Sequence, residues 1–171
     1  MTIWMWLFII AIICQRLIEL VIAKHNEQWM KERGGVEQGE THYKWMVLLH
    51  VIFFLSLLTE AHLQTANISF HLGLFLIFLI AQLGRVWCIT SLGKFWNTKI
   101  IVLPNVALIT RGPYKWVKHP NYIIVGIEMF VIPLLVGAYW TAFLFPILHV
   151  LLLKIRVPEE ERALRKAGVP D

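Results

Sequence analysis

The sequence predicts an all-α integral membrane protein with about five transmembrane helices, a small cytoplasmic catalytic segment and a short C-terminal helix. Of the 171 residues, 58% are hydrophobic and only 16% are charged, whereas a soluble domain of this size carries about 25% charged residues. The chain also contains several apolar runs close to the roughly 20 residues that a membrane-spanning helix needs. We therefore expect a single membrane domain, 1–171, with no room for a separate soluble enzyme domain.

The first three apolar runs predict three spans in the N-terminal part, 1–91. They cover about Ile3–Ala23, then Trp45–Leu58 with an extension toward Ala61, and then Phe70–Ile89. The first run has no basic region before it and no small-residue cleavage site after it. We therefore expect a retained span rather than a signal peptide.

The C-terminal part, 92–171, is expected to hold the catalytic segment, a helical hairpin and a polar tail. Within 90–118, the β-prone runs KIIVL and ALIT flank Pro104-Asn105 and predict a small hairpin on the cytoplasmic interface. The next apolar run, Tyr122–Leu153, is too long for one span. We divide it near Val136–Tyr139 into two short helices joined by a tight turn.

The tail begins at Lys154 and contains the run VPEEER. Because a proline disfavours the helical conformation of the residue before it, we expect the helix to break at Val157. A new short helix would then begin at Pro158. Its first turn would hold Glu159, Glu160 and Glu161, where negative charge is favourable.

Lysine and arginine gather on one side of this predicted fold. With five spans, the segments 24–44, 90–118 and the tail meet on one side and hold most of these cations, whereas 60–70 and 136–141 hold none. The positive-inside rule then places the N-terminus outside and the C-terminus and active site in the cytoplasm. Because the +5 net charge lies at the ends of apolar segments, no nucleic acid partner is expected.

Few polar groups lie inside the predicted spans. Arg16 and Glu19 are three residues apart on one helical face, so we expect an ion pair and favour a structural role for it over a functional one. For Glu128 the two roles are equally weighted, because an ion inside a membrane is a functional candidate by default. Cys14 and Cys88 have no metal-like spacing; we expect buried thiols and no metal site.

The stretch RGPYKWVKHPNY, residues 111–122, combines cations, a histidine and aromatic rings directly before an apolar run. Pro120 suits the first position of a helix, whose first turn exposes backbone donors and a partial positive charge. Lys118 and His119 stand beside it, which favours binding of a carboxylate or phosphate. Three rings could stack on a base: Tyr114, Trp116 and Tyr122. An interfacial belt of aromatic and basic residues is an equally weighted alternative.

Two motifs at these positions resemble the isoprenylcysteine carboxyl methyltransferase family. The family pattern is roughly GPY, three residues, RHPxY, and then RIxxEExxL. The residues that match it are Gly112, Pro113, Tyr114, His119, Pro120, Tyr122, Arg156, Glu160, Glu161 and Leu164. LGKFW, Leu92–Trp96, is similar to the family's LGxxW, so the resemblance covers about 92–166. Lys118 stands where the family has an arginine. It keeps the positive charge but lacks the planar guanidinium. Val157 stands where the family has an isoleucine.

The resemblance implies an integral membrane methyltransferase that uses S-adenosylmethionine. The residues implied to bind this cofactor are Tyr114, Val117, Lys118, His119, Tyr122, Glu160 and Glu161. Arg156 would orient the acceptor oxygen and would be catalytic together with Glu160. The residue chemistry agrees, because a helix N-terminus suits the carboxylate, aromatic rings suit the sulfonium, and acids suit the ribose hydroxyls.

The implied acceptor is a lipophilic molecule with an acidic oxygen that enters from the bilayer, and membrane lipids are the other expected partners. The small chain is typical of bacterial members of the family and so of a bacterial cell membrane. The acceptor stays open between an alkylpyrone or polyketide-lipid enol and a prenylcysteine-like carboxylate. Alternatives are a phospholipid N-methyltransferase, a structural membrane protein, and an NADPH-dependent sterol-type reductase. The 2′-phosphate of NADPH would require an arginine cluster, and only Arg111 and Arg156 are near.

Overall fold

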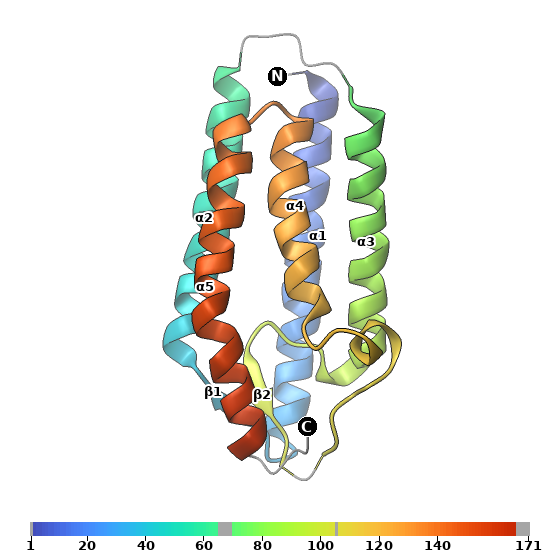
Figure 1. Cartoon of the computed structure of the whole chain (residues 1–171), viewed down its shortest axis with the longest axis vertical. Coiled ribbons are helices and arrows are strands. Elements are labelled where there is room, and N and C mark those ends of the chain that lie inside the picture. Colours follow the sequence, from blue (N-terminus) through green and yellow to red (C-terminus); the bar gives the residue numbers. More distant parts are fainter. Residues whose placement is uncertain (1, 65–69, 105, 167–171) are drawn as a thin grey trace.

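The computed structural model describes residues 2–64, 70–104 and 106–166, with residues 40–42 described by their backbone alone. Its helices are α1 (Ile3–Lys31), α2 (Glu40–Leu63), α3 (Leu72–Leu92), α4 (Pro120–Leu135) and α5 (Tyr139–Lys166). The shorter elements are the strands β1 (Val36–Gln38) and β2 (Ile100–Val102) and the 3-10 turns η1 (Gly93–Phe95) and η2 (Gly112–Lys115). The helices lie side by side along the long axis (Figure 1). The strands lie at one end, and the turn from α4 to α5 lies at the other.

Four of the described helices are long and apolar enough to cross a membrane, namely α1, α2, α3 and α5. The fifth, α4, is a shorter apolar helix of 16 residues. The prediction of an all-α membrane protein is therefore confirmed, while the number of crossings and their direction stay predictions.

The apolar core lies in the half of the bundle that is distant from the strands. Each helix contributes to it, for example through Ile9, Leu57, Phe78, Ile132 and Phe145. Helix α4 packs between α3 and α5, and α2 packs against α5. Many large apolar side chains point outward instead, as expected for a bundle whose surrounding solvent is lipid.

The apolar run after Tyr122 is divided where the sequence predicts. Helix α4 ends at Leu135, α5 begins at Tyr139, and Gly137 has a φ of 76°, which glycine adopts without steric cost. Glu60 of α2 caps the start of α5. Its carboxylate accepts hydrogen bonds from the Thr141 hydroxyl and from the backbone N–H groups of Trp140 and Thr141, each at 2.8 Å. A carboxylate is favourable there because it meets unpaired N–H groups and the positive end of the helix dipole.

The predicted helix break at Val157 and the separate C-terminal helix are wrong. Helix α5 continues without interruption through Pro158 to Lys166. A proline removes one backbone hydrogen bond and biases the preceding residue. Tertiary contacts on both sides outweigh that bias. Arg156 is held by Tyr122 and Thr98, and Ala163 is buried against Ile100 and Val102.

The predicted hairpin between KIIVL and ALIT is also wrong. Strand β2 pairs antiparallel with β1, with Val36 opposite Val102 and Gln38 opposite Ile100. Residues 106–110 have no regular secondary structure. Ion pairs explain the choice of partner, since the Lys99 ammonium lies 3.1 Å from the Glu37 carboxylate. The resulting ribbon lies against α5.

The two cysteines differ from each other. Cys88 of α3 is buried, as predicted, but Cys14 of α1 is exposed on the outside of the bundle. The prediction of a buried Cys14 thiol is therefore wrong. A thiol is apolar enough to face lipid, so an apolar sequence context alone does not distinguish an inward from an outward position.

Candidate active site

A cavity of about 380 Å³ extends into the bundle from the end that carries the strands. Six of the residues that line it come from the two matched motifs: Tyr114, Lys118, His119, Tyr122, Arg156 and Glu160. We call this part the mouth. Toward the middle of the bundle the lining becomes mainly apolar, with Phe53, Phe54 and Ile132 among its residues.

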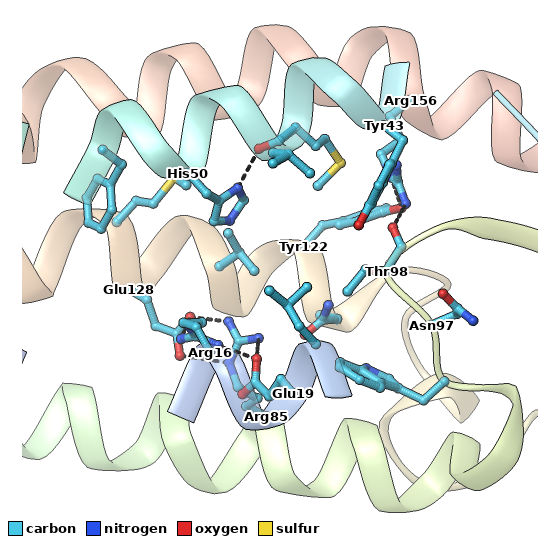
Figure 2. A pocket seen from close by; sticks show the side chains of 18 of the residues that line it. Arg16, Glu19, Tyr43, His50, Arg85, Asn97, Thr98, Tyr122, Glu128 and Arg156 are labelled. Atoms are coloured by element: carbon cyan, nitrogen blue, oxygen red, sulfur yellow. Dashed lines mark hydrogen bonds and ion pairs between the residues drawn. The ribbon is translucent and has the colours of Figure 1, made fainter. Parts of the chain in front are cut away.

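A chain of hydrogen bonds connects the mouth residues. The Tyr122 hydroxyl donates to Glu160 at 2.5 Å and accepts from Nε of Arg156 at 2.8 Å. Nη2 of Arg156 donates to the backbone carbonyl of Thr98 at 2.6 Å. The His119 ring stacks on the Tyr122 ring, with 5.4 Å between their centroids. These contacts join α4, α5 and the loop after α3 (Figure 2).

Local sequence explains why these side chains converge. Pro120 is the first residue of α4 and His119 is its N-cap, as predicted. His119 and Tyr122 are therefore one turn apart on the same face. On α5, Arg156 and Glu160 are four residues apart and also share a face. The unbroken course of α5 through Pro158 is what places Glu160 beside Tyr122.

Three buried polar atoms at the mouth lack a hydrogen-bond partner within the described residues. They are Nε2 of His119, Oδ1 of Asn121 and Nη1 of Arg156. An unpaired buried polar atom costs about 1–3 kcal/mol, so such atoms are uncommon and need an explanation. All three belong to residues that line the cavity. A polar ligand at the mouth would satisfy them.

The GPY motif positions Tyr114 through a close approach to α3. Gly112 has a φ of 60°, and a Cβ there would lie 2.1 Å from the Ser91 hydroxyl, so only glycine fits. Burial raises the pKa of Tyr114, and the neighbouring Cys88 thiol and Glu160 carboxylate raise it further. Tyr114 is therefore a neutral phenol at the mouth.

The other predicted cofactor residues lie at different places. Glu161 Oε1 is 3.9 Å from Nε2 of His119, so the second acid borders the mouth. Lys118 is exposed and lines the cavity. Val117 is 40% exposed and lies on a separate apolar groove between α4 and α5. The structure does not bring Val117 to the cavity.

Deeper in the cavity lies a group of four buried or nearly buried ions, which we call the charge collar: Arg16, Glu19, Arg85 and Glu128. The predicted Arg16–Glu19 pair is confirmed at 2.7 Å. Arg16 also lies 2.9 Å from Glu128, and Arg85 binds both Glu19 and Glu128. The collar thus joins α1, α3 and α4.

The sequence predictions missed two parts of this lining. Arg85 is not among the candidate residues of the sequence analysis, yet it is buried and paired within the bundle. The signal for it was the presence of ionisable groups in three of the predicted spans, because such groups pair inside membranes. His50 of α2 also lines the cavity. It is a lone titratable residue within an apolar run, which the same argument could have found.

The loop that carries Thr98 is tied to α1. The Asn26 side-chain amide donates to the Trp96 carbonyl at 2.8 Å. Next to it, the ammonium of Lys99 lies between Glu27 and Glu37. Burial alone would raise the pKa of Glu37, but the ammonium groups of Lys31 and Lys99 outweigh burial and lower it. These contacts fix the outer side of the mouth.

The cavity is open sideways between α1 and α2. Leu17 and Leu20 of α1 and Val47 and Val51 of α2 line it. The same four side chains are between 43% and 57% exposed on the outer surface. Because these side chains belong both to the cavity wall and to the outer surface of the bundle, they form the rim of a lateral opening. This side of the cavity therefore faces the lipid region.

These features define an all-α membrane protein with unpaired polar atoms at the mouth of an apolar, laterally open cavity. Residues 71–166 match the profile of the isoprenylcysteine carboxyl methyltransferase (ICMT) family. The chain belongs to this family, which supports a membrane methyltransferase.

Two relatives extend the similarity beyond the matched segment. A Bacillus subtilis protein that carries the name uncharacterized protein YpbQ is 45% identical over 165 residues, which is 96% of this chain and 98% of the relative. An uncharacterized protein of Haemophilus influenzae is 31% identical over 160 residues, or 90% of this chain and 91% of the relative. The similarity therefore includes the N-terminal helices that carry half of the charge collar.

Proposed function

We propose that this protein transfers a methyl group from S-adenosylmethionine to a lipophilic acceptor that enters from the bilayer. The observation that carries this proposal is the mouth. Three unpaired buried polar atoms surround the hydrogen-bonded Tyr122, Arg156 and Glu160. Next to them is an apolar cavity that is open to the lipid side.

The mouth residues fit the parts of S-adenosylmethionine. The unpaired Nε2 of His119 and the first turn of α4 suit its carboxylate. Glu160 and Glu161 suit the ribose hydroxyls and attract the cationic sulfonium, and the Tyr122 ring offers a face to that cation. When bound, the cofactor supplies an electrophilic methyl carbon. The residues of this chain hold and orient it.

The cavity suits a long apolar acceptor. The acceptor would pass between α1 and α2 and place its oxygen near Arg156, whose unpaired Nη1 is available to it. Methyl transfer to an oxyanion needs little further acid or base. Alignment of the reacting groups then supplies most of the rate, and such alignment contributes roughly 7–11 kcal/mol in model reactions.

We place the mouth on the cytoplasmic side. The end of the bundle that carries the strands (Figure 1) also carries most of the lysine and arginine residues, and the positive-inside rule assigns such an end to the cytoplasm. S-adenosylmethionine would reach the mouth from there. Membrane lipids would surround the apolar surface of the bundle.

The reductase alternative is less well supported. A 2′-phosphate favours an arginine cluster. Arg156 is engaged with Tyr122 and Thr98, and Nε of Arg111 donates to the Ser91 carbonyl at 2.7 Å. A phospholipid N-methyltransferase would use the same cofactor and differ only in its acceptor, so acceptor assays separate it from our proposal.

Binding measurements test the cofactor assignment. In calorimetry of the detergent-solubilised protein, we expect S-adenosylhomocysteine to bind and NADPH not to bind. Glu160→Gln should lower the affinity for S-adenosylhomocysteine at least about tenfold, because the variant loses a charge-assisted hydrogen bond at the mouth. His119→Ala should also weaken it.

Glu159→Gln is the matched control. The Glu159 carboxylate lies 2.9 Å from the Arg162 guanidinium, and this pair is not part of the mouth. Its affinity should equal that of the wild type. Binding of NADPH without S-adenosylhomocysteine would exclude the methyltransferase. Unchanged affinity in both mouth variants would exclude this site.

A further inference from the structure

The groove between α4 and α5 is a second recess, on the outer surface of the bundle. It has a volume of about 640 Å³ and meets the cavity at Lys118, His119 and Tyr122, which line both. The two helices pack side by side (Figure 1). Among its walls are Ile123 and Val150, which are 55% and 52% exposed. The groove therefore faces the lipid region.

A glycine keeps the middle of this groove open. Gly126 of α4 lines it, and a Cβ at this position would lie 3.6 Å from Cδ2 of His149, which is ordinary van der Waals contact. Farther from the mouth, the groove continues between apolar side chains, with Phe130 on α4 and Pro146 on α5. This shape suits a hydrocarbon chain that lies along the two helices.

His149 of α5 adds one polar atom to the groove. The residue is 1% exposed and lines the groove. Its Nε2 lies 3.0 Å from the Tyr122 carbonyl, and a carbonyl oxygen only accepts hydrogen bonds, so Nε2 is the donor. Nδ1 then holds a lone pair. It is buried and has no hydrogen-bond partner within the described residues. A ligand that satisfies it must bring a donor, such as a hydroxyl group.

Two lysines lie where the groove approaches the mouth. Lys118 lines the groove. The exposed Lys154 of α5 lies four residues after Val150 and three before Val157, and both of these line the groove. Residues at these spacings share one side of a helix, so Lys154 borders the groove as well. This end of the groove consequently carries two ammonium groups.

The acids of α5 near the mouth are engaged with other residues. Glu160 accepts a hydrogen bond from the Tyr122 hydroxyl, and the Glu161 carboxylate lies 3.8 Å from the Arg165 guanidinium. In the described part of the chain, neither lysine of the groove has an ion-pair partner. The positive charge at this end is therefore available to an anionic headgroup.

The order of these groups along α5 defines the ligand. His149 lies five residues before Lys154, which is about 7.5 Å deeper into the bundle, and Pro146 lies deeper still. A ligand that matches this order has an anion first, a hydroxyl next and an apolar chain last. In phospholipids, a hydroxyl between the phosphate and the chain is the free glycerol hydroxyl of a monoacyl lipid.

We propose that this groove is a binding site for an anionic monoacyl glycerophospholipid of the surrounding membrane. Its phosphate pairs with Lys118 and Lys154, its glycerol hydroxyl donates to Nδ1 of His149, and its single acyl chain passes Gly126 along the groove. A zwitterionic lipid fits less well, because its own cation opposes the lysines. The site lies outside the cavity and does not depend on the proposed methyl transfer.

The binding test uses native mass spectrometry of the whole protein in a neutral detergent. The probe is lysophosphatidic acid, whose only alcohol is the glycerol hydroxyl. We expect it to bind at least about tenfold more tightly than lysophosphatidylcholine, because lysines near the membrane surface favour anionic lipids. Its 2-O-methyl analogue keeps the phosphate and the chain but cannot donate to His149. We expect this analogue to bind about three- to tenfold more weakly than the probe.

Variants locate the bound lipid. Gly126→Leu fills the groove and should lower the affinity for lysophosphatidic acid at least about tenfold, because the acyl chain loses several buried methylene groups. Gly73→Leu is the matched control, since Gly73 lies on α3 with no atom within 4 Å of an added Cβ. It should bind as the wild type does. His149→Phe should bind the hydroxyl and methoxy lipids equally.

Equal binding of lysophosphatidic acid and lysophosphatidylcholine by the wild type would overturn the proposal. Equal binding of the hydroxyl and methoxy lipids by the wild type would overturn it too. Unchanged affinity in Gly126→Leu would place the lipid outside the groove and would have the same effect. Thermal unfolding checks that the variants are folded, and the two wild-type comparisons decide the question if they are not.

Discussion

Arg156 shows how one residue connects the helices of the mouth. It is 3% exposed, and its three nitrogens face different directions. Nε donates to the Tyr122 hydroxyl, Nη2 donates to the Thr98 carbonyl, and Nη1 has no described partner. A planar guanidinium can satisfy this arrangement, whereas an ammonium cannot reach all three directions at once.

Arg156→Lys should therefore lower turnover more than cofactor affinity. Lysine keeps the charge but loses the Nη1 group that we assign to the acceptor oxygen, so we expect methyl transfer to fall about 10- to 100-fold. Methyl-transfer assays and S-adenosylhomocysteine calorimetry measure the two effects. Arg162→Lys is the control, because Arg162 is exposed. A larger loss of affinity than of turnover would make Arg156 a cofactor residue.

For single residues, a short motif predicts membership of a common site when the residues are close along the chain. His119 and Tyr122 could be assigned to one site because their spacing fixes a common helical face. Glu160 could be assigned because an acidic cluster at a membrane surface is unusual. Val117 was assigned by its place in the motif alone, and its side chain points to a different surface. Asn121 and His50 carry no motif signal, and their role depends on which neighbours the fold brings to them.

Helix α5 spans the whole bundle as one element of 28 residues, despite Pro146 and Pro158. Pro158 is exposed. On one side of it, Arg156 is hydrogen-bonded to Tyr122 and Thr98. On the other side, Ala163 is buried against strand β2. Anchors on both sides keep the helix continuous although one backbone hydrogen bond is missing. This continuity couples the mouth acids to the membrane-embedded part of the protein.

Pro158→Ala should accordingly stabilise the protein. Alanine restores the N–H that can donate to the Lys154 carbonyl, and proline is about 3 kcal/mol less favourable than alanine in a helix interior. We expect a gain of roughly 1–3 kcal/mol in thermal unfolding, with unchanged S-adenosylhomocysteine affinity. Pro120→Ala should give no such gain, since proline is favourable at the first position of α4. Loss of stability in Pro158→Ala would contradict the view that Pro158 destabilises α5.

At the scale of elements, hydropathy predicts helices well and strand pairing poorly. The long apolar runs locate α1, α2 and α3, because the membrane requirement is local in sequence. The partner of β2 could not be predicted from the local runs around it. It is β1, far earlier in the chain, and the pairing is selected by the ion pairs of Glu37 and by burial against α5.

For the whole molecule, the charge collar holds three helices together. Buried ions are tolerated there because each meets an opposite charge. Glu19 and Glu128 each accept contacts from both Arg16 and Arg85. The sequence indicates the separate ions but not their common location, since no spacing rule connects positions on different helices.

Glu128→Leu should be strongly destabilising, because it leaves two arginines facing the single carboxylate of Glu19. We expect a loss of about 3–5 kcal/mol, which is typical when one partner of a buried pair is removed. The double variant Arg85→Met with Glu128→Leu keeps the Arg16–Glu19 pair and should regain most of that loss. Thermal unfolding in detergent measures both. Equal stability of the single and double variants would show that the collar is not a stabilising unit.

The Glu60 cap has a consequence for how the bundle can move. It fixes α2 to α5 at the end away from the mouth, and the hydroxyls of Ser56 and Thr141 add a contact at 2.8 Å. The collar fixes α1 to α3 and α4. In the described part of the chain, no hydrogen bond or ion pair joins α1 to α2. A lipid tail can therefore pass between α1 and α2 without breaking a polar bond between these two helices.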